Sequence, residues 1–555
     1  MFNARIISSL EKCFIEDLPI DKPPLSHLTA YKNEKFSFQL VYRMDGTPSR
    51  FRGFAGISVS SDLNFTVRTV EQVPVLMPVI PGACDDDYIK KTPGLYPDPL
   101  LPLMHGGTAA PLCEEETRAL WIEAVPGKDG FEPGDHTVNV TMTLGDETLF
   151  SGSLQVKVIG AELPPSDLLF TQWFHCDCLA SYYNVPVFSE KHWKIIENYA
   201  RVAADNGMNM ILTPVFTPPL DTHVGGERLT VQLVDVEVTD HGYEFGFKRL
   251  KRFIRTCRRV GITHFEISHL FTQWGAAHAP KIVAKVNGEM KRIFGWETDS
   301  TGDEYRGFLS AFIPKLLEVL RSEGVDKNCR FHVSDEPSAE QLPVYKEAKK
   351  GIADLLRGYP IMDALSSVEF YREGIIEHPI PGCDHIEPFY EAKVPELWTY
   401  YCCGQHTDVP NRFISMPSYR NRIIGFLFYK YNVKGFLQWG YNFYNDQGSY
   451  DAINPYISAA CGYFTQAGDG FSVWPAQNGE AYESVRIRVF AEALDDLRAL
   501  RLCESIYGRE FTLGLLEEEL DRPLKFSDWP KSAGYILKTR EKIDLAVARG
   551  LSDAE

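Results

Sequence analysis

The amino-terminal part of the chain shows the period of two that is typical of β-strands. Apolar and polar residues alternate over 36–42, 138–144 and 154–158. Turn sequences such as Pro133-Gly134-Asp135 separate these runs, as expected for antiparallel strands. Paired prolines at 164–165 follow the last run and end it. The pattern predicts a β-sandwich over residues 1–163.

From residue 164 onward, short apolar runs alternate with longer segments of helical period. The predicted strands are 168–174, 208–214, 264–270, 329–335, 362–368, 396–401 and 435–440, with an eighth near 471–474. The predicted helices are 189–206, 247–260, 303–323 and 341–357, and a hairpin is expected near 228–245. This βα alternation predicts a (β/α)8 TIM-like barrel over residues 164–500, with a doubly wound sheet as the alternative. Residues 501–555 are predicted to form C-terminal helices packed on the barrel, which makes the chain a multidomain β plus α/β protein.

One acidic pair stands out from the other acidic residues. Asp335-Glu336-Pro337 closes a run in which Phe331 and Val333 alternate with polar residues. Pro337 cannot donate to a sheet ladder and helps to end the strand. The pair is therefore expected at the carboxyl end of a buried strand, whereas acidic runs such as 85–87 are expected to be solvated. In a barrel, catalytic groups lie at the carboxyl ends of the strands, so Asp335 and Glu336 are the candidate catalytic residues.

Other predicted strand ends carry aromatic and polar side chains of the kind that bind sugars. Aromatic faces can stack on the apolar face of a sugar ring, and amide, imidazole and carboxylate groups can bind its hydroxyls. Each aromatic residue has ordinary core packing as its alternative explanation, and His332 is expected to be a hydrogen-bonded interior histidine. The candidate substrate-binding residues are Trp173, His175, His269, Tyr390, Tyr400, Tyr401, Trp439 and Asn442.

Composition and charge narrow the class of partner. The chain has 555 residues and a formal net charge of −18, which disfavours binding to nucleic-acid phosphates. No stretch approaches the roughly 18 apolar residues of a membrane span, so no membrane partner is expected. The start lacks the apolar core of a secretory signal, and the twelve cysteines are scattered. We therefore expect reduced thiols and a cytoplasmic protein.

A metal site is the alternative use of several polar residues. The run His175-Cys176-Asp177-Cys178 could suggest metal ligands, but a buried strand with small apolar thiols is the favoured interpretation. His175, Asp177 and His269 could also be arranged as ligands of a metal-dependent hydrolase. We expect no metal or other cofactor.

Several segments together resemble glycoside hydrolase family 123. His332–Pro337 is similar to the catalytic motif of that family, and Pro93–Leu100 to a segment of its N-terminal domain. Trp398–Cys402 is similar to its W-x-Y-x-C strand. Two further segments, Arg422 with Gly435–Trp439 and Ser484–Asp496, resemble motifs near the end of its barrel. The chain departs from the last motif at Arg488, Ala491 and Ala493, where the family has a carboxylate, an arginine and a glycine.

The resemblance implies a retaining exo-glycosidase that releases terminal β-linked N-acetylgalactosamine from small glycans. In the family mechanism, the 2-acetamido oxygen of the substrate attacks the anomeric carbon and forms an oxazoline-type intermediate. Glu336 would then be the general acid and base, and Asp335 would orient and stabilise the acetamide. A tyrosine among Tyr390, Tyr400 and Tyr401 would bind the acetamide carbonyl. Trp439 would form the sugar platform, and Asn442 and His269 would bind hydroxyls.

Three alternatives remain open from the sequence. The first is a glycosidase on the same scaffold that acts on β-N-acetylglucosamine or another sugar. The second is a non-catalytic glycan-binding protein, against which the intact Asp335-Glu336 pair argues. The third is the metal-dependent hydrolase described above.

Overall fold

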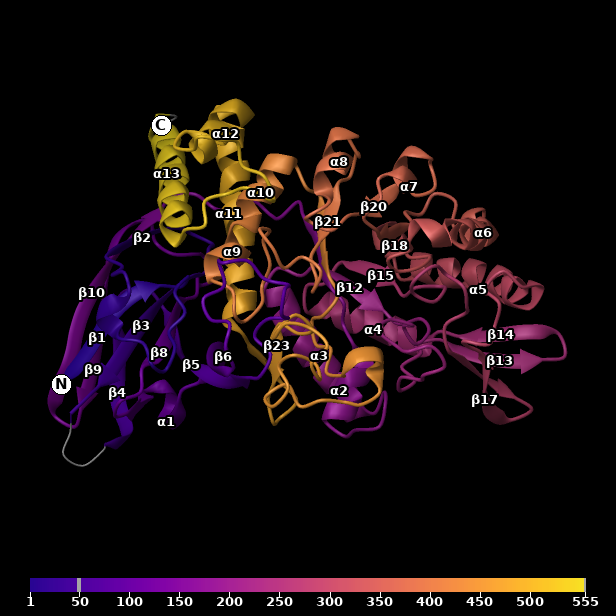
Figure 1. Ribbon diagram of the computed structural model, residues 1–555, viewed down its shortest axis with the longest axis horizontal. Helices are drawn as coiled ribbons and strands as arrows, with labels where there is room; N and C mark the ends of the chain where they lie inside the picture. Colours follow the sequence, from indigo (N-terminus) through magenta and orange to yellow (C-terminus); the bar gives the residue numbers. More distant parts are fainter. Residues whose placement is uncertain (47–50, 554–555) are drawn as a thin grey trace.

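The computed structural model describes residues 1–46 and 51–553. Its amino-terminal region is β-rich, with two five-stranded sheets (Figure 1) and only one short helix, α1 (Met104–Gly107), and one 3-10 turn among its described residues. The first sheet contains, in spatial order, β1 (Phe2–Ser8), β3 (Phe36–Met44), β8 (Arg118–Ala124), β5 (Phe65–Val75) and β6 (Gly94–Pro102). The second contains β2 (His27–Tyr31), β10 (Glu147–Ile159), β9 (Gly134–Leu144), β4 (Arg52–Ser60) and β7 (Ala109–Cys113). Side chains of both sheets, such as Leu40 and Val138, share one buried cluster.

The remainder of the chain is built on parallel strands. A six-stranded sheet has the order β18-β15-β12-β11-β22-β21, and β19 and β20 form a parallel pair. Single parallel bridges, Phe331–Ile361 and Gly382–Tyr400, lie between this pair and the two edge strands of the larger sheet. The bounds of these strands are β11 (Leu169–Gln172), β12 (Met210–Thr213), β15 (His264–Ile267), β18 (Cys329–Phe331), β19 (Met362–Ala364), β20 (His378–Ile380), β21 (Trp398–Tyr400) and β22 (Gly435–Gln438).

Two of the predicted strands need correction. Residues near 471–474 do not form a parallel strand, because β23 (Val473–Pro475) pairs antiparallel with β24 (Ala481–Glu483). The strand that the sequence missed is β20, which has only three residues and a central proline, too few to show a period. The predicted strand 329–335 ends already at Phe331, so the acidic pair lies in a loop and not in the strand.

The predicted helices are present, with ends shifted by a few residues. They are α3 (Glu190–Asp205), α4 (Lys248–Arg259), α5 (Asp303–Ser322) and α6 (Leu342–Ala353). The predicted hairpin is β13 (Asp235–Thr239) with β14 (Gly242–Gly246), which joins β16 (Ile282–Val286) and β17 (Glu289–Phe294) in a four-stranded sheet. This sheet lies at the end of the molecule remote from the amino-terminal sheets (Figure 1). In the described ranges, no helix combines the length and apolar character needed to cross a membrane.

The C-terminal helices contact both parts of the molecule. They are α11 (Val485–Tyr507), α12 (Arg509–Glu517) and α13 (Ala533–Ser552). The predicted boundary at residue 500 falls inside α11, which is continuous across it. Besides packing on the α/β part, α13 reaches the amino-terminal sheets, where Asp544 accepts a hydrogen bond from Thr29 of β2 at 2.6 Å.

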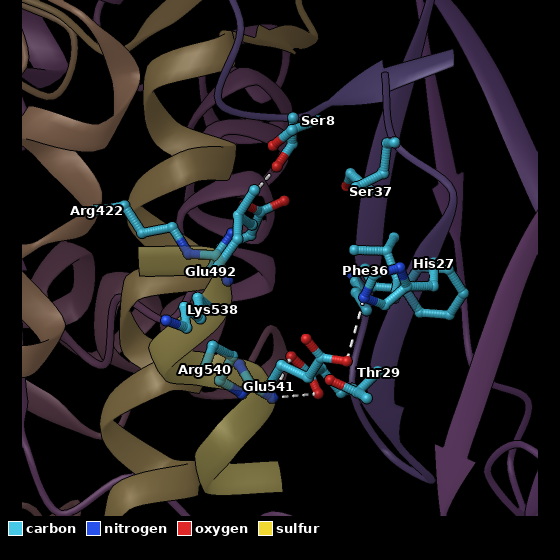
Figure 2. Close-up of a pocket in the computed structure, with 16 residues that line it drawn as sticks. Ser8, His27, Thr29, Phe36, Ser37, Arg422, Glu492, Lys538, Arg540 and Glu541 are labelled. Atoms are coloured by element: carbon cyan, nitrogen blue, oxygen red, sulfur yellow. Dashed lines mark hydrogen bonds and ion pairs between the residues drawn. The ribbon is translucent and has the colours of Figure 1, made fainter. Parts of the chain in front are cut away.

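An ionic cluster joins these helices to the amino-terminal sheets. Arg540 of α13 pairs with Glu34 at 2.7 Å, with Asp496 of α11 at 2.7 Å and with Asp544 at 2.8 Å, and all four side chains are buried. Figure 2 shows Arg540 beside a cleft of about 260 Å³ whose two walls come from the helices and the sheets. Since the charges are paired across the cleft, they hold the two parts in one relative position.

A second ionic cluster lies among the parallel strands, directly before the acidic pair. His332 follows β18 and is fully buried between Glu266 of β15, at 2.7 Å, and Asp363 of β19, at 3.1 Å. Burial opposes the charged form, but the hydrogen bonds to Asp363 and Glu266 outweigh it and raise the pKa of His332 to about 10. His332 is therefore an imidazolium at neutral pH.

Replacing Arg540 by methionine is expected to destabilise the protein by about 3–5 kcal/mol, because buried Glu34 and Asp544 lose their cation and Asp496 keeps only Arg422. Urea unfolding followed by circular dichroism measures the change. Arg522→Met is the matched control, since Arg522 forms a surface ion pair and its side chain is 77% exposed; we expect a change below about 0.5 kcal/mol there. Equal effects of the two substitutions would contradict a stabilising role for the buried cluster.

Replacing His332 by glutamine is expected to cost about 3–5 kcal/mol at neutral pH, because Glu266 and Asp363 lose the cation between them. Because the pKa of His332 is raised in the folded state, its protonated form stabilises the fold. This contribution is complete below pH 6.5 and is lost as the pH rises through about 10. The stability difference between wild type and His332→Gln should therefore shrink in urea titrations repeated at increasing alkaline pH. A difference that does not change with pH would show that His332 is neutral in the folded protein. His27→Gln, at an exposed ion pair, is the control.

Candidate active site

Asp335 and Glu336 lie in the loop after β18, where the parallel strands end. Neighbouring strand ends hold this loop: the Trp274 N–H donates to the Asp335 carbonyl at 2.8 Å, and the Glu336 N–H donates to the Ala364 carbonyl at 3.0 Å. Glu336 has a φ of 43°, in the left-handed region that side chains other than glycine rarely adopt. Such strain costs on the order of 1–3 kcal/mol and concentrates at functional sites.

The surroundings of the acidic pair favour the protonated form of Asp335. Burial, followed by the neighbouring charges of Glu336 and Asp221, raises the pKa of Asp335 well above its usual value. Because the two residues are adjacent and the Glu336 charge is one cause of this shift, the protonation of Asp335 is coupled to its neighbour. A carboxyl pair that retains one proton can supply both a general acid and a carboxylate.

Tyr400 contacts this pair directly. Its hydroxyl donates to Glu336 Oε1 at 2.6 Å, from the end of β21. Burial, followed by the charge of Glu336, raises the pKa of Tyr400 well above its usual value. Tyr400 is thus a neutral hydrogen-bond donor to Glu336.

Asp221, in the loop after β12, is a site residue that the sequence analysis missed. Its φ is 45°, and two loops fix its backbone: its N–H donates to Gln273 Oε1 at 2.6 Å, and its carbonyl accepts from Ser449 Oγ at 2.8 Å. Burial raises the pKa of Asp221 to about 7, Arg228 opposes this shift, and the Glu336 charge adds to it. An acid that follows the Pro218-Pro219 turn after an apolar strand was the available signal.

Trp439 lies at the end of β22 and is held by a buried acid. Its indole Nε1 donates to Asp469 Oδ2 at 3.0 Å, and Thr465 Oγ1 donates to the same oxygen at 3.0 Å. Burial raises the pKa of Asp469 to about 6. The Asp469 charge in turn contributes to the raised pKa of Asp221, which places Trp439 and its partner on the same side of the strands as Asp221.

Trp173 and His269 lie deeper, against the buried His332. Trp173 Nε1 donates to Glu266 Oε1 at 2.7 Å, and its ring meets the His269 ring edge-on at 5.3 Å. The His269 ring stacks on His332 at 4.3 Å, and burial together with that cation lowers the pKa of His269 well below its usual value. Neither nitrogen of His269 has a hydrogen-bond partner among the described residues, and both are buried.

The structure brings His175 and Asn442 together in a structural role. The His175 N–H donates to Asn442 Oδ1 at 2.9 Å, and Asn442 Nδ2 donates to the His175 carbonyl at 3.1 Å. Both side chains are buried, and His175 Nε2 bonds the Trp439 carbonyl at 3.0 Å. These two residues therefore support the segment that carries Trp439 and leave no group directed at the acidic pair.

Tyr401 and Tyr390 are not brought to the acidic pair. Tyr401 is fully buried, its hydroxyl donates to Asn421 Oδ1 at 3.1 Å, and its ring packs on Phe436. Tyr390 belongs to α8 (Ile386–Glu391) and packs on Tyr431 at 4.8 Å. Tyr431 ends the helix that leads into β22, so Tyr390 lies at the amino-terminal end of the strands, opposite Glu336.

The residues considered as metal ligands are engaged otherwise. Arg228 pairs with Asp177 at 2.7 Å and contacts His175 Nδ1 at 3.0 Å, so a guanidinium stands where a cation would have to bind. The run 176–178 begins the helix α2 (Cys176–Tyr182) and is not the buried strand that was favoured. His269 lies near His332 and Asp363, but an imidazolium whose nitrogens both bond carboxylates has no lone pair for a metal.

All twelve cysteines lie in the described part of the chain and are free thiols. Their sulfur atoms form no disulfide there, as expected for a chain with scattered cysteines. Cys402, two residues after Tyr400, has its pKa raised well above the usual value by its neighbour Cys403, by burial and by the nearby Glu336 charge. This thiol is therefore a poor nucleophile.

Comparison with known proteins identifies a family and a fold. The family model described as "Glycoside hydrolase 123, catalytic domain" matches residues 173–503. A solved family 123 glycoside hydrolase from Clostridium perfringens, described for glycolipid glycan hydrolysis, has a TM-score of 0.74 at 15% identity, with 100% of this chain and 98% of that chain covered.

A family 39 glycoside hydrolase from Bacteroides cellulosilyticus covers 86% of this chain and 82% of its own, but its TM-score of 0.34 at 9% identity is too low to support an argument. No curated protein matches the sequence. The likeness to the Clostridium structure concerns the fold, which is mixed β plus α/β in both. Since the family model spans more than half of the sequence and includes the acidic pair, the chain belongs to glycoside hydrolase family 123.

Proposed function

We propose that this protein is a retaining exo-glycosidase that releases terminal β-linked N-acetylgalactosamine by substrate-assisted catalysis. The observation that carries the proposal is the adjacency of Asp335 and Glu336 in one loop. A retaining enzyme with two catalytic carboxyls needs them on opposite faces of the scissile bond, about 5 Å apart. Consecutive residues in one strained loop are poorly placed for that, so the nucleophile is assigned to the acetamide of the substrate.

In the proposed mechanism, Glu336 protonates the glycosidic oxygen while the acetamide oxygen attacks the anomeric carbon. The C1–O bond to the leaving group breaks, and the acetamide closes into an oxazolinium ion. Asp335 accepts the acetamide N–H and stabilises the positive charge that develops there. Glu336 then removes a proton from water, which attacks C1, opens the ring and restores the acetamide with net retention.

The surrounding groups are assigned supporting roles. The Tyr400 hydroxyl, which bonds Glu336 at 2.6 Å, orients that carboxyl and can bind the acetamide oxygen. Trp439, fixed by Asp469, is assigned the wall of the sugar pocket, and His269 binds a ring hydroxyl through its free nitrogens. Glycan is the substrate class because the chain belongs to a glycoside hydrolase family and its structural relative is described for glycolipid glycan hydrolysis.

We further propose that the parallel strands form one (β/α)8 barrel. The bridges Phe331–Ile361 and Gly382–Tyr400 support this, because they would join β19 and β20 to both edges of the six-stranded sheet. The division into a region 1–163, a barrel from 164 and C-terminal helices stays a prediction, as does the cytoplasmic location. A β-N-acetylglucosaminidase and a non-catalytic glycan-binding protein remain the alternative functions.

A panel of three 4-nitrophenyl glycosides tests the substrate and the need for the acetamide. We expect turnover of the β-N-acetylgalactosaminide and none of the β-galactoside, which lacks the internal nucleophile. The β-N-acetylglucosaminide, which differs only at C4, should be cleaved more slowly. Proton NMR should show the β-anomer of the sugar as the first product. Hydrolysis of the galactoside, or the α-anomer as the first product, would contradict the proposal. If none of the three glycosides is hydrolysed, a binding protein is favoured, and a glycan array would then identify its ligand.

Substitution of the acidic pair separates the two proposed roles. Glu336→Gln should reduce kcat/KM by about 10²–10⁴-fold on a disaccharide and by less on the nitrophenyl glycoside, because nitrophenolate leaves without a proton. Asp335→Asn should reduce both by about 10²–10³-fold, because an amide does not stabilise the oxazolinium charge. Glu340→Gln, at an exposed acid shortly after the pair, is the matched control. Losses of the same size for both substrates in Glu336→Gln would remove its assignment as the general acid.

A further inference from the structure

Trp274 is the exposed tryptophan of this protein. The chain has nine tryptophans, all in the described ranges, and the other eight are buried or half-buried. The Trp274 side chain is 50% exposed, although an indole gains more than most side chains from burial. An exposed tryptophan beside an active site calls for a functional explanation.

The backbone that presents Trp274 is strained and tightly held. Trp274, Gly275 and Ala276 have φ values of 57°, 108° and 61°, three consecutive left-handed residues of which two are not glycine. The Gly275 N–H donates to Ser334 Oγ at 3.3 Å, and the Ala276 N–H to the Thr272 carbonyl at 3.2 Å. Strain of this kind persists only where the surroundings enforce it, so the loop holds the backbone of Trp274 in one position.

Gly275 shows how little freedom this loop has. A Cβ added there would lie 2.8 Å from Cβ of Gln341, in the short helical turn that follows the acidic pair. The loop after β15 is therefore pressed against the segment that carries Asp335 and Glu336. The backbone of Trp274 therefore cannot move away from that segment without breaking the hydrogen bonds described above.

The position of Trp274 relative to Glu336 indicates which part of the substrate it can contact. Its N–H donates to the carbonyl of Asp335 at 2.8 Å, one residue from Glu336. A general acid must lie on the leaving-group side of the glycosidic bond, because it protonates the oxygen of that group. A residue with a solvent-exposed aromatic ring is therefore held next to the acid, on the path of the leaving group.

Charge further restricts the leaving group. Asp221, Asp335 and Glu336 lie close together: the Glu336 charge helps to raise the pKa of Asp221, and the charges of Glu336 and Asp221 help to raise the pKa of Asp335. This acidic surrounding disfavours a leaving group that bears a carboxylate, such as an acidic sugar. An uncharged pyranose, with one apolar C–H face for the indole and hydroxyls for the acids, fits both properties.

We propose that Trp274 forms a leaving-group subsite, in which its indole stacks on the pyranose ring of the neutral sugar to which the terminal residue is attached. This inference rests on the proposed glycosidase function and extends it to the class of the second sugar.

The kinetic test compares two donors with the same terminal sugar: the β-linked disaccharide of N-acetylgalactosamine and galactose, and N-acetylgalactosaminyl fluoride, whose leaving group is too small to stack. For Trp274→Ala we expect kcat/KM to fall about tenfold or more on the disaccharide and several-fold less on the fluoride. Trp274→Phe should recover most of the loss. Equal losses on both donors, or no loss on either, would overturn the subsite.

A binding test keeps this proposal separate from the proposed function. Saturation-transfer NMR with methyl β-galactoside alone should show contact in wild type and in Trp274→Phe, and none in Trp274→Ala. Phe511→Ala, which removes an exposed aromatic residue of α12, is the control and should behave as wild type. If wild type cleaves no N-acetylgalactosaminide but still binds the galactoside through Trp274, the proposed function fails and the sugar subsite stands. No contact in wild type would overturn the subsite. Thermal unfolding of each variant verifies that it is folded.

Discussion

The buried pairing of His332 with Glu266 and Asp363 is the constraint on which the site depends. Its three side chains come from β15, from the residue after β18 and from β19, and Trp173 and Thr171 of the β11 region also donate to Glu266. Buried charges are stable only when each has a partner, so these strand ends are held in one register. The loop of Asp335 and Glu336 begins directly after His332, so the cluster fixes where this loop starts.

Above that rigid layer, the site is made of loops in unfavourable backbone conformations. Asp221, Trp274, Ala276 and Glu336 all have left-handed φ values, and each comes from a loop that follows a parallel strand. Hydrogen bonds between these loops, such as Trp274 to Asp335 and Asp221 to Gln273, maintain the strained positions. The stability of the surrounding structure thus offsets the cost of holding Asp221, Trp274 and Glu336 in these neighbouring loops.

The amino-terminal sheets are joined to the rest by buried ion pairs, and these explain much of the family resemblance. Asp98 of β6 bonds Arg486 of α11 at 2.8 Å and accepts from Trp474 Nε1 at 2.8 Å. Arg488, where the family motif has a carboxylate, pairs with Glu123 of β8 at 2.7 Å. The segments around Asp98 and Arg486 are therefore motifs of the interface between the two parts of the molecule, and the departure at Arg488 lies in that interface too.

The sequence by itself determined the features that depend on neighbouring residues. The helix α3 begins at the Ser189 cap, whose hydroxyl accepts from the His192 N–H, and the acidic pair follows an apolar strand; both are visible in a short window. The tertiary structure alone decided which side chains meet. Adjacent Tyr400 and Tyr401 point to opposite faces, as in any strand, but only the assembled sheet shows that Tyr400 faces Glu336. Asp221 and Trp274 are far from the pair in sequence, and their roles arise from hydrogen bonds between loops, which no local pattern encodes.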